Sequence, residues 1–380
     1  MNKRLSNRAM IDHHCHAVVT RDLARDEFED MISESFAPAP LGTSHWDKPV
    51  GLAIRRWCAP VLDLPKFASG EEYIARRLEL GAGEVNERFL KQSGITAYVV
   101  DTGNRPGLLC SYEELGNAAD VPSYEVVRME SVAEEVMRAG CDAKGYADAF
   151  EAAVEASLHD RVVGLKTIVA YRSTLRIDQT APNRNEIEAA ASGWLTEIEE
   201  TGTIRIGDEV LERHILWTGA DIARQKGLPI QFHIGLGDPD VEVHACDPSH
   251  LTGYFRAVEP WGVPMTLLHC YPFHREAGLL AENFPNIYFD VGFVQNWAGP
   301  SYRKMMEEAL ELAPFTKQLF STDAFGLSEL FYLGTMRFRD SLDAVLDHWI
   351  ELDECTPDYA EQIKTWISGQ NAERIYGLSG

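Results

Sequence analysis

Short apolar runs alternate along this chain with longer stretches in which apolar residues recur every three or four positions. The short runs are rich in Val and Ile, which favour strands, and the longer stretches have the spacing of amphipathic helices. Alternation of this kind is typical of repeated β-α units around a parallel sheet. We predict eight strands, at residues 9–12, 95–103, 124–130, 162–172, 228–235, 264–270, 286–292 and 318–324.

Eight such units favour a closed barrel over an open sheet. An open doubly wound sheet that binds a dinucleotide carries a glycine-rich turn after its first strand, and the sequence has none after residue 12. We therefore predict an α/β protein with a (β/α)8 TIM barrel, in which the whole chain, 1–380, forms a single domain.

Two segments, residues 20–92 and 173–227, are too long to be simple connections of such a barrel, and the second contains acidic helices. Residues 20–92 have helical spacing and separate the first predicted strand from the second. We predict a helical insertion there, which serves as a lid or an oligomer surface. Residues 341–380 are predicted to form closing helices, two in number. On general grounds we expect a barrel of this kind to be a homo-oligomer.

Charge and cysteine content narrow the class of protein. The 380 residues include 35 Lys and Arg against 59 Asp and Glu, which gives a net charge of -24. Nucleic acids and anionic membranes both need a basic surface, so we expect neither as a partner and expect a small-molecule substrate instead. The seven cysteines are scattered, which favours reduced thiols in the cytoplasm. The N-terminal stretch MNKRLSNRAM is basic, and no apolar leader segment follows it.

Polar residues of metal-ligand type stand at the ends of the predicted strands, where barrel enzymes keep their active sites. In IDHHCHAVV (11–19), His14 and His16 share one face of an extended chain, whereas His13 and Cys15 face elsewhere. Bulky aliphatic residues are the ordinary content of barrel strands, so core packing does not account for a whole series of polar ends. The series comprises His14 and His16, Lys166, His233, His269 and Asp323.

These residues lie in motifs that resemble the amidohydrolase superfamily of metal-dependent barrel hydrolases. The motifs are HHCH, GLKTI, QFHIG, LLHCYP and FSTDAFG. The longer runs around them look like the branch that includes nodulin-like proteins and amidohydrolase domains fused to glutamine-synthetase-like proteins. The resemblance covers about residues 9–335 and is thin over the helical insertion.

The resemblance implies a ligand set for a divalent metal. His14 and His16 would bind the ion together with Asp323, and His233 would be a further ligand. His269 would bind a second metal or orient the substrate. Imidazole and carboxylate ligands suit Zn²⁺, as one or two ions, with Mn²⁺ and Fe²⁺ as alternatives.

The resemblance also implies catalytic roles for Lys166, His269 and Asp323. In members with two metals, a carboxylated lysine at the end of strand four bridges the ions, and Lys166 could take that place. The alternatives for Lys166 are a hydrogen bond to the substrate or an ammonium group beside Asp323. Asp323 would accept the proton of a metal-activated water and return it to the leaving amine.

Five further residues are candidates for substrate binding. Arg128 and Glu130 end strand three and Arg172 follows strand four, so either arginine could clamp a substrate carboxylate. The alternative is an internal ion pair between Arg128 and Glu130. His250 and His274 lie in the loops after strands five and six, where each is a substrate contact or a surface residue.

Three functions remain open at this point. The first is a metal-dependent hydrolase of an amide or related C–N bond in a small carboxylate-bearing molecule. The second is a decarboxylase or sugar-acid isomerase on the same metal site. Decarboxylases of this type begin strand one with Glu or Ala before the histidine pair, where this chain has Asp12 and His13. The third is a catalytically silent binding module.

Overall fold

The structure, a computed structural model, describes residues 9–105 and 107–378. Two sequence predictions extend beyond this range. The interpretation of MNKRLSNRAM falls mostly on residues 1–8, and the predicted C-terminal tail includes residues 379–380. Both parts lie outside the described residues.

The fold is α/β with a parallel sheet, as the sequence predicts. Seven strands are present in the described residues, and their order in the sheet is their order in the chain, β1 to β7. Each corresponds to one of the first seven predicted strands. They are β1 Ile11–Cys15, β2 Ala97–Asp101, β3 Ser123–Arg128, β4 Val162–Thr167, β5 Ile230–His233, β6 Met265–Leu268 and β7 Ile287–Phe289.

The chain divides into two compact units, which we describe separately. Unit 1 consists of residues up to Val100, Arg105–Tyr124 and the chain from Asp290 onward. Unit 2 consists of Asp101–Asn104 and Glu125–Phe289.

In unit 1 the segment predicted as an eighth strand lies beside β1 without forming a regular strand. His13 N–H donates to the Phe320 carbonyl at 3.1 Å, and Asp323 N–H donates to the His14 carbonyl at 3.1 Å. An isolated parallel bridge joins Val18 and Gly326 further along. The segment therefore runs along β1 as a strand would, but a complete eight-stranded barrel stays a prediction.

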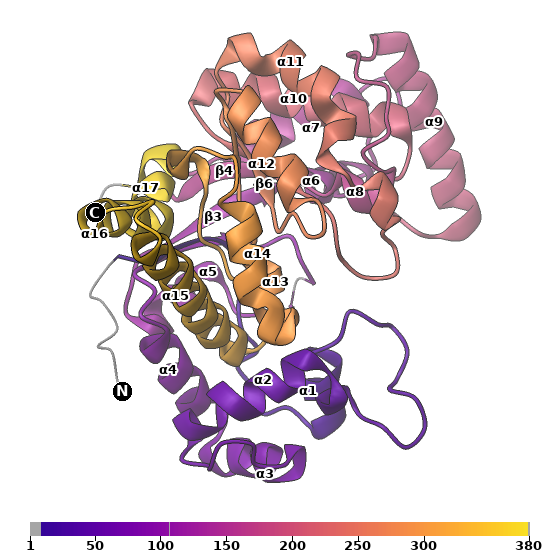
Figure 1. Ribbon diagram of the computed structural model, residues 1–380. Coiled ribbons are helices and arrows are strands. Elements are labelled where there is room, and N and C mark those ends of the chain that lie inside the picture. Colours follow the sequence, from indigo (N-terminus) through magenta and orange to yellow (C-terminus); the bar gives the residue numbers. More distant parts are fainter. Residues whose placement is uncertain (1–8, 106, 379–380) are drawn as a thin grey trace. The chain divides into compact units, whose positions relative to one another are not determined.

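Helices make up most of unit 1. Residues between β1 and β2 form four of them, and α4 packs against the long helix α15, which also packs along α14 (Figure 1). α15 begins before residue 341, at Ser328, so the predicted closing helices start earlier than expected. The helices of unit 1 are α1 Arg25–Asp30, α2 Pro49–Trp57, α3 Gly70–Leu80, α4 Ala82–Ser93, α5 Tyr112–Ala119, α13 Gly292–Trp297, α14 Tyr302–Ala309, α15 Ser328–Glu351, α16 Pro357–Thr365 and α17 Asn371–Tyr376.

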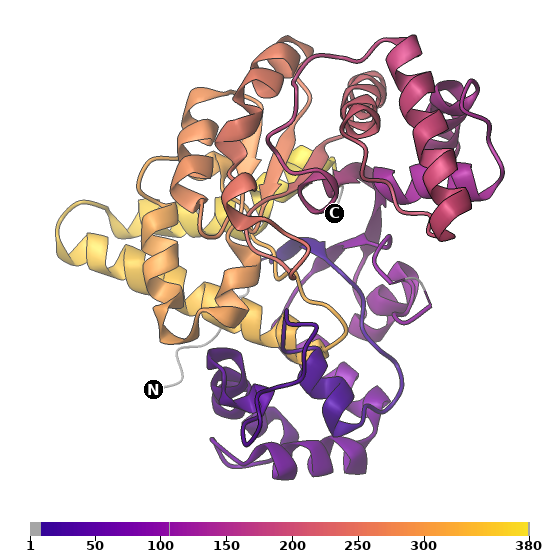
Figure 2. The same cartoon turned by 90° about the vertical axis from the view of Figure 1, so that its right-hand side faces the viewer.

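Unit 2 contains the ladder from β3 to β7 and the helices that connect these strands. Apolar side chains of its strands form a buried core, as at Leu165, Phe232 and Leu267. α9 packs against α7 and α10, a helix group that Figure 2 shows from a second side. The helices of unit 2 are α6 Met129–Arg138, α7 Tyr146–Ala156, α8 Val169–Arg172, α9 Arg184–Thr201, α10 Glu209–Lys226, α11 Thr252–Val258 and α12 His274–Asn283.

Six of the strands, β2 to β7, end earlier than the sequence pattern indicates, and β3 and β4 show why. The run 124–130 gives β3 only to Arg128, and Glu130 belongs to α6. The run 162–172 gives β4 only to Thr167, and its last residues form α8. The Glu130 carboxylate explains the second ending, because it accepts hydrogen bonds from Thr167 Oγ1 at 2.6 Å and Ile168 N–H at 2.8 Å. The bond to the Ile168 N–H satisfies a backbone group that a longer strand would have paired in the sheet.

Candidate metal centre

Three of the predicted ligands meet in unit 1. The ligand atoms of His14, His16 and Asp323 all lie within 4.8 Å of one another. Asp323 Oδ1 is 3.2 Å from His14 Nε2 and 3.5 Å from His16 Nε2. Both imidazoles are buried and their rings meet edge to face, with centroids 5.3 Å apart. In the described residues this is the one group of three or more His, Cys, Asp or Glu with donor atoms this close.

The backbone explains why these side chains converge. His14 belongs to β1 and His16 follows its last residue, and both direct Nε2 toward Asp323, so the two side chains share one face as predicted. Asp323 has a left-handed backbone, with φ of 48°, which is uncommon for any residue other than glycine. Its N–H nevertheless bonds to the His14 carbonyl, so the strained residue is anchored to the strand that carries the histidines. Strain of this kind is concentrated at functional sites.

A buried carboxyl, Asp12, holds the residue before Asp323. It accepts hydrogen bonds from Thr322 N–H at 2.9 Å and Thr322 Oγ1 at 2.5 Å. Complete burial raises the pKa of Asp12 to about 8, although the bonds from Thr322 oppose that shift. Sequence reasoning noted Asp12 only as a departure from decarboxylases and missed this anchoring contact.

His13 belongs to a different network in the same unit. Its Nδ1 lies 2.9 Å from the Tyr376 hydroxyl and its Nε2 lies 2.9 Å from Asp290 Oδ2. Asp290 Oδ1 also accepts hydrogen bonds from Ser321 Oγ at 2.8 Å and Gly292 N–H at 2.7 Å. The ring of His13 is therefore directed away from the metal-ligand group, as the alternation predicts.

The two partners of His13, Asp290 and Tyr376, differ in how well the sequence could have predicted them. Asp290 directly follows β7, so the rule that selected the other strand ends could have found it. Tyr376 lies 363 residues from His13 along the chain and carries no motif that links the two. Cys15, expected to face elsewhere, is fully buried with its thiol 3.7 Å from the Val99 carbonyl.

The donor set of His14, His16 and Asp323 fits a divalent metal. Two imidazole nitrogens and a carboxylate oxygen are ligands that Zn²⁺ and related ions accept, and three protein ligands leave a position for water or substrate. The three donors are nearly buried, so an ion between them would compensate a carboxylate that is partly removed from water.

In unit 2 the predicted ligands His233 and His269 also lie close together. Their ring centroids are 5.0 Å apart, and Tyr171 covers His233 at 4.4 Å. β5 and β6 pair His233 with Leu268, so regular alternation would turn His269 to the opposite face. The strand ends at that point, and a left-handed backbone at His269, with φ of 66°, allows its ring to approach His233.

Lys166 lies deeper in unit 2 than these histidines. It is the penultimate residue of β4, is 2% exposed, and pairs in register with Gln231. Gln231 precedes His233 by two positions on β5, so Lys166 stands on the same face and one alternation before the end of that strand. Lys166 therefore lies near the carboxyl end of β4, because most of the residues predicted to continue the strand form α8 instead.

The arginine candidates are already engaged with carboxylates inside unit 2. Arg128 Nη2 lies 2.5 Å from Asp101 Oδ2, and Arg172 Nη2 lies 3.1 Å from Glu134 Oε1. The expected ion pair between Arg128 and Glu130 is wrong. Because the chain enters α6 after Arg128, Glu130 is directed to the turn after β4 instead.

The two further histidine candidates are also held by neighbours. His250 Nε2 accepts a hydrogen bond from Arg176 Nε at 3.0 Å. His274 is not a loop residue, because it begins α12, where it is buried and stacks on Tyr271 with ring centroids 6.0 Å apart. The expectation of a surface position for His274 is therefore wrong.

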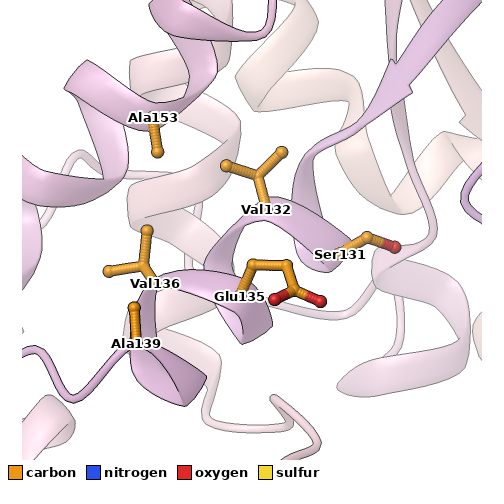
Figure 3. A pocket seen from close by; sticks show the side chains of 6 residues that line it. All are labelled: Ser131, Val132, Glu135, Val136, Ala139 and Ala153. Carbon is orange, nitrogen blue, oxygen red and sulfur yellow. The ribbon is translucent and has the colours of Figure 1, made fainter.

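A hollow of about 400 Å³ lies between α6 and α7, and its lining differs from the candidate metal centre (Figure 3). Its lining carries one carboxylate and no imidazole, so it lacks the histidine ligands found beside β1. The lining residues are Ser131, Val132, Glu135, Val136, Ala139 and Ala153. Separately, none of the described helices is both long and apolar enough to cross a membrane.

Comparisons with known proteins agree with the motifs. A family model described as Amidohydrolase matches residues 200–378, a range that contains His233, His269 and Asp323. The protein fluG of Emericella nidulans is 30% identical over 238 residues, which are 60% of this chain. The chain spans only about a quarter of that protein, 27% of its length.

Solved structures share the fold over nearly the whole chain. A protein of Lactobacillus casei, classed with the metal-dependent hydrolases, is 26% identical with a TM-score of 0.84 and covers 97% of this chain and 95% of its own. Uronate isomerase of Thermotoga maritima is 16% identical with a TM-score of 0.63, over 97% of this chain and 94% of its own. The isomerase of Bacillus halodurans is 13% identical with a TM-score of 0.66, over 98% and 94%.

Proposed function

We propose, for a chain that belongs to the amidohydrolase superfamily, a metal-dependent hydrolase that cleaves an amide or related C–N bond in a small carboxylate-bearing substrate. The observation that carries this proposal is the convergence of His14, His16 and Asp323 donors within 4.8 Å. The family implies a divalent metal, and we propose Zn²⁺ at these three residues. When bound, such an ion acidifies water and polarises a carbonyl.

Asp323 has the geometry for proton transfer in this reaction. Its Oδ1 lies within 3.5 Å of both imidazoles, so its carboxylate borders the place where substrate and water would meet the histidines. A carboxylate there can accept a proton from the attacking water and deliver it to the leaving amine. Its backbone bond to His14 keeps the group in place while its protonation changes.

We further propose that His233, His269 and Lys166 serve the same reaction. All three lie at or near carboxyl ends of strands, where barrels of this superfamily assemble their sites. His233 would be an additional ligand, His269 a ligand or a group that orients the substrate, and Lys166 a bridging or substrate-binding amine.

The experiment that tests the proposal combines metal analysis with a substrate panel. Purified protein is analysed for bound metal, loaded with Zn²⁺, and assayed against N-acyl amino acids and their neutral carboxamides. We expect one or two divalent ions for each chain and release of free amino acid. A matched control is Asp353→Asn, because Asp353 also has a left-handed backbone, with φ of 60°, but is exposed on the surface.

The alternative is a non-hydrolytic reaction on the same donor set. Uronic acids and aromatic carboxylic acids in the panel test isomerisation and CO₂ release. Turnover of these compounds with no hydrolysis of any amide would replace the proposed reaction. A protein that binds no divalent metal and is inert to the whole panel would instead be a binding module.

A further inference from the structure

Arg105 lies in unit 1 next to the candidate metal centre, in the connection between β2 and α5. Its guanidinium carbon is 5.3 Å from the centroid of the Phe325 ring. Phe325 follows Asp323 by two positions and meets His16 edge to face, with ring centroids 5.8 Å apart. Two successive contacts thus connect the exposed guanidinium of Arg105 to a metal-ligating imidazole.

Arg105 differs from the arginines that the sequence singled out. Arg128 and Arg172 each have a carboxylate partner, Asp101 and Glu134. Arg105 has no ion pair or side-chain hydrogen bond with any residue that the structure describes, and Phe325 is its recorded side-chain contact. Its donors are available to a ligand from solvent.

The backbone at Arg105 adds a second observation. Its φ is 45°, in the left-handed region that residues with a side chain rarely adopt. Two glycines, Gly103 and Gly107, stand close to it in the same connection. Arg105 therefore occupies a position where glycine would be less strained. Strained residues of this kind are concentrated in functional loops.

We infer that Arg105 binds the carboxylate of the substrate at this site and so selects anionic substrates over neutral ones. The inference rests on the proposed function, since it identifies the substrate class of the same metal centre. A guanidinium can donate two parallel hydrogen bonds to a carboxylate. The Phe325 ring lies against the guanidinium of Arg105, and Arg105 is exposed to solvent. On a chain with a net charge of -24, the guanidinium of Arg105 adds a local positive charge that favours an anionic ligand.

The test measures carboxylate binding independently of turnover. Calorimetry on Zn²⁺-loaded protein compares glutarate with its neutral diamide for the wild type and Arg105→Gln. We expect Arg105→Gln to weaken glutarate binding about tenfold or more, which is the usual scale for one charge-assisted pair, and to leave diamide binding unchanged. Arg105→Lys keeps the charge without the planar fork and should weaken glutarate binding by a smaller factor.

Arg56→Gln is the matched control, because Arg56 also stacks on an aromatic ring, Trp57 at 4.8 Å, but belongs to α2. It should bind glutarate like the wild type. Melting temperatures and Zn²⁺ content show whether each variant is folded and loaded. If Arg105→Gln retains wild-type affinity for glutarate, or if the wild type does not bind glutarate, the inference is wrong.

The panel of N-acyl amino acids separates this inference from the proposed function. If Arg105→Gln loses glutarate affinity while no amide is hydrolysed by the wild type, the carboxylate site stands and the hydrolase proposal fails. If amides are hydrolysed and Arg105→Gln has an unchanged preference for acids over carboxamides, the hydrolase stands and the role of Arg105 is overturned.

Discussion

His13 and His14 are neighbours on β1, yet they belong to two opposite kinds of site. The ring of His13 has a protein partner at each nitrogen, Tyr376 and Asp290, both at 2.9 Å. His14 and its alternate neighbour His16 instead aim Nε2 at a single oxygen of Asp323, at 3.2 and 3.5 Å. One face of the strand carries a closed hydrogen-bond network, and the other carries converging donors.

The difference shows that neighbouring residues of one short segment can serve different purposes, with His13 stabilising the fold and His14 available for binding. A closed network satisfies each buried polar group and favours a single arrangement of the surrounding chain. Converging imidazoles and a carboxylate would suit a cation, as in a metal site with an open position. Side-chain alternation along β1 is sufficient to keep the two apart.

The largest effect is expected from Asp323→Asn, which preserves shape and removes the proton acceptor. We expect kcat/KM on the cleaved amide to fall by about 1,000-fold, in the range typical of a general acid–base group. Steady-state kinetics with metal analysis of the same sample measures this effect, and Asp353→Asn should behave like the wild type. Near-normal activity of Asp323→Asn with metal bound would remove Asp323 from its proposed role.

The next test compares alanine variants of the histidines that face opposite sides of this segment. His14→Ala and His16→Ala should each weaken metal binding by 100-fold or more, which is about 3 kcal/mol. His13→Ala should retain the metal but lose about 3 kcal/mol of unfolding free energy, because the buried Asp290 Oδ2 loses its hydrogen bond to the His13 ring.

Metal titration and urea unfolding of the three alanine variants distinguish these outcomes. The comparison fails if His13→Ala loses metal in its folded form, or if His14→Ala retains wild-type affinity. Cys15→Ser provides a control on the same strand, since the Cys15 thiol is packed against β2.

Another buried histidine, His214, should make the stability of the protein depend on pH. His214 in α10 packs against the Tyr146 and Phe150 rings, and burial lowers its pKa to about 4. The unfolded chain, with a pKa near 6.5, then binds more protons than the folded chain between these values. Above pH 6.5 His214 does not lower the free energy of unfolding. As pH falls from 6.5 toward 4, that free energy decreases by about 3 kcal/mol in total because of His214.

Urea unfolding of the wild type and His214→Phe at pH 7.5, 5.5 and 4.5 isolates this contribution, because the other titrating groups are shared. We expect the wild type to lose stability relative to the variant as pH falls. A difference that stays constant across the series would show that His214 keeps an ordinary pKa.

The smallest effect is expected from Tyr376→Phe, which removes one hydrogen bond to His13. The loss should be about 1 kcal/mol of unfolding free energy, the typical value for a single bond. Metal affinity should not change. A loss of metal affinity in this variant would mean that the network of His13 also controls the ligands on the other face.

Sequence reasoning predicted the repeated parts of this molecule and missed contacts that only folding creates. Seven strands were recognisable because Val and Ile runs mark buried parallel strands. The end of β4 was not, because residues 169–172 suit a helix as well as a strand, and the bonds to Glu130 decide between them. The segment 318–324 follows β1 with irregular bonds that no local pattern predicts.

The candidate site divides in the same way. His14, His16 and Asp323 could be predicted from alternation, strand ends and motifs together. Tyr376 and Arg105 could not, because their roles depend on partners distant in sequence, His13 and Phe325.

The most direct test of the account is a crystal structure of the protein grown with Zn²⁺, with diffraction recorded on both sides of the zinc absorption edge. The account predicts an anomalous peak within bonding distance, about 2.0–2.2 Å, of His14 Nε2, His16 Nε2 and an oxygen of Asp323. The ring of His13 should remain on Asp290 and Tyr376. A peak at other residues with these three donors unoccupied, or no peak in a protein that is active without metal, would contradict it.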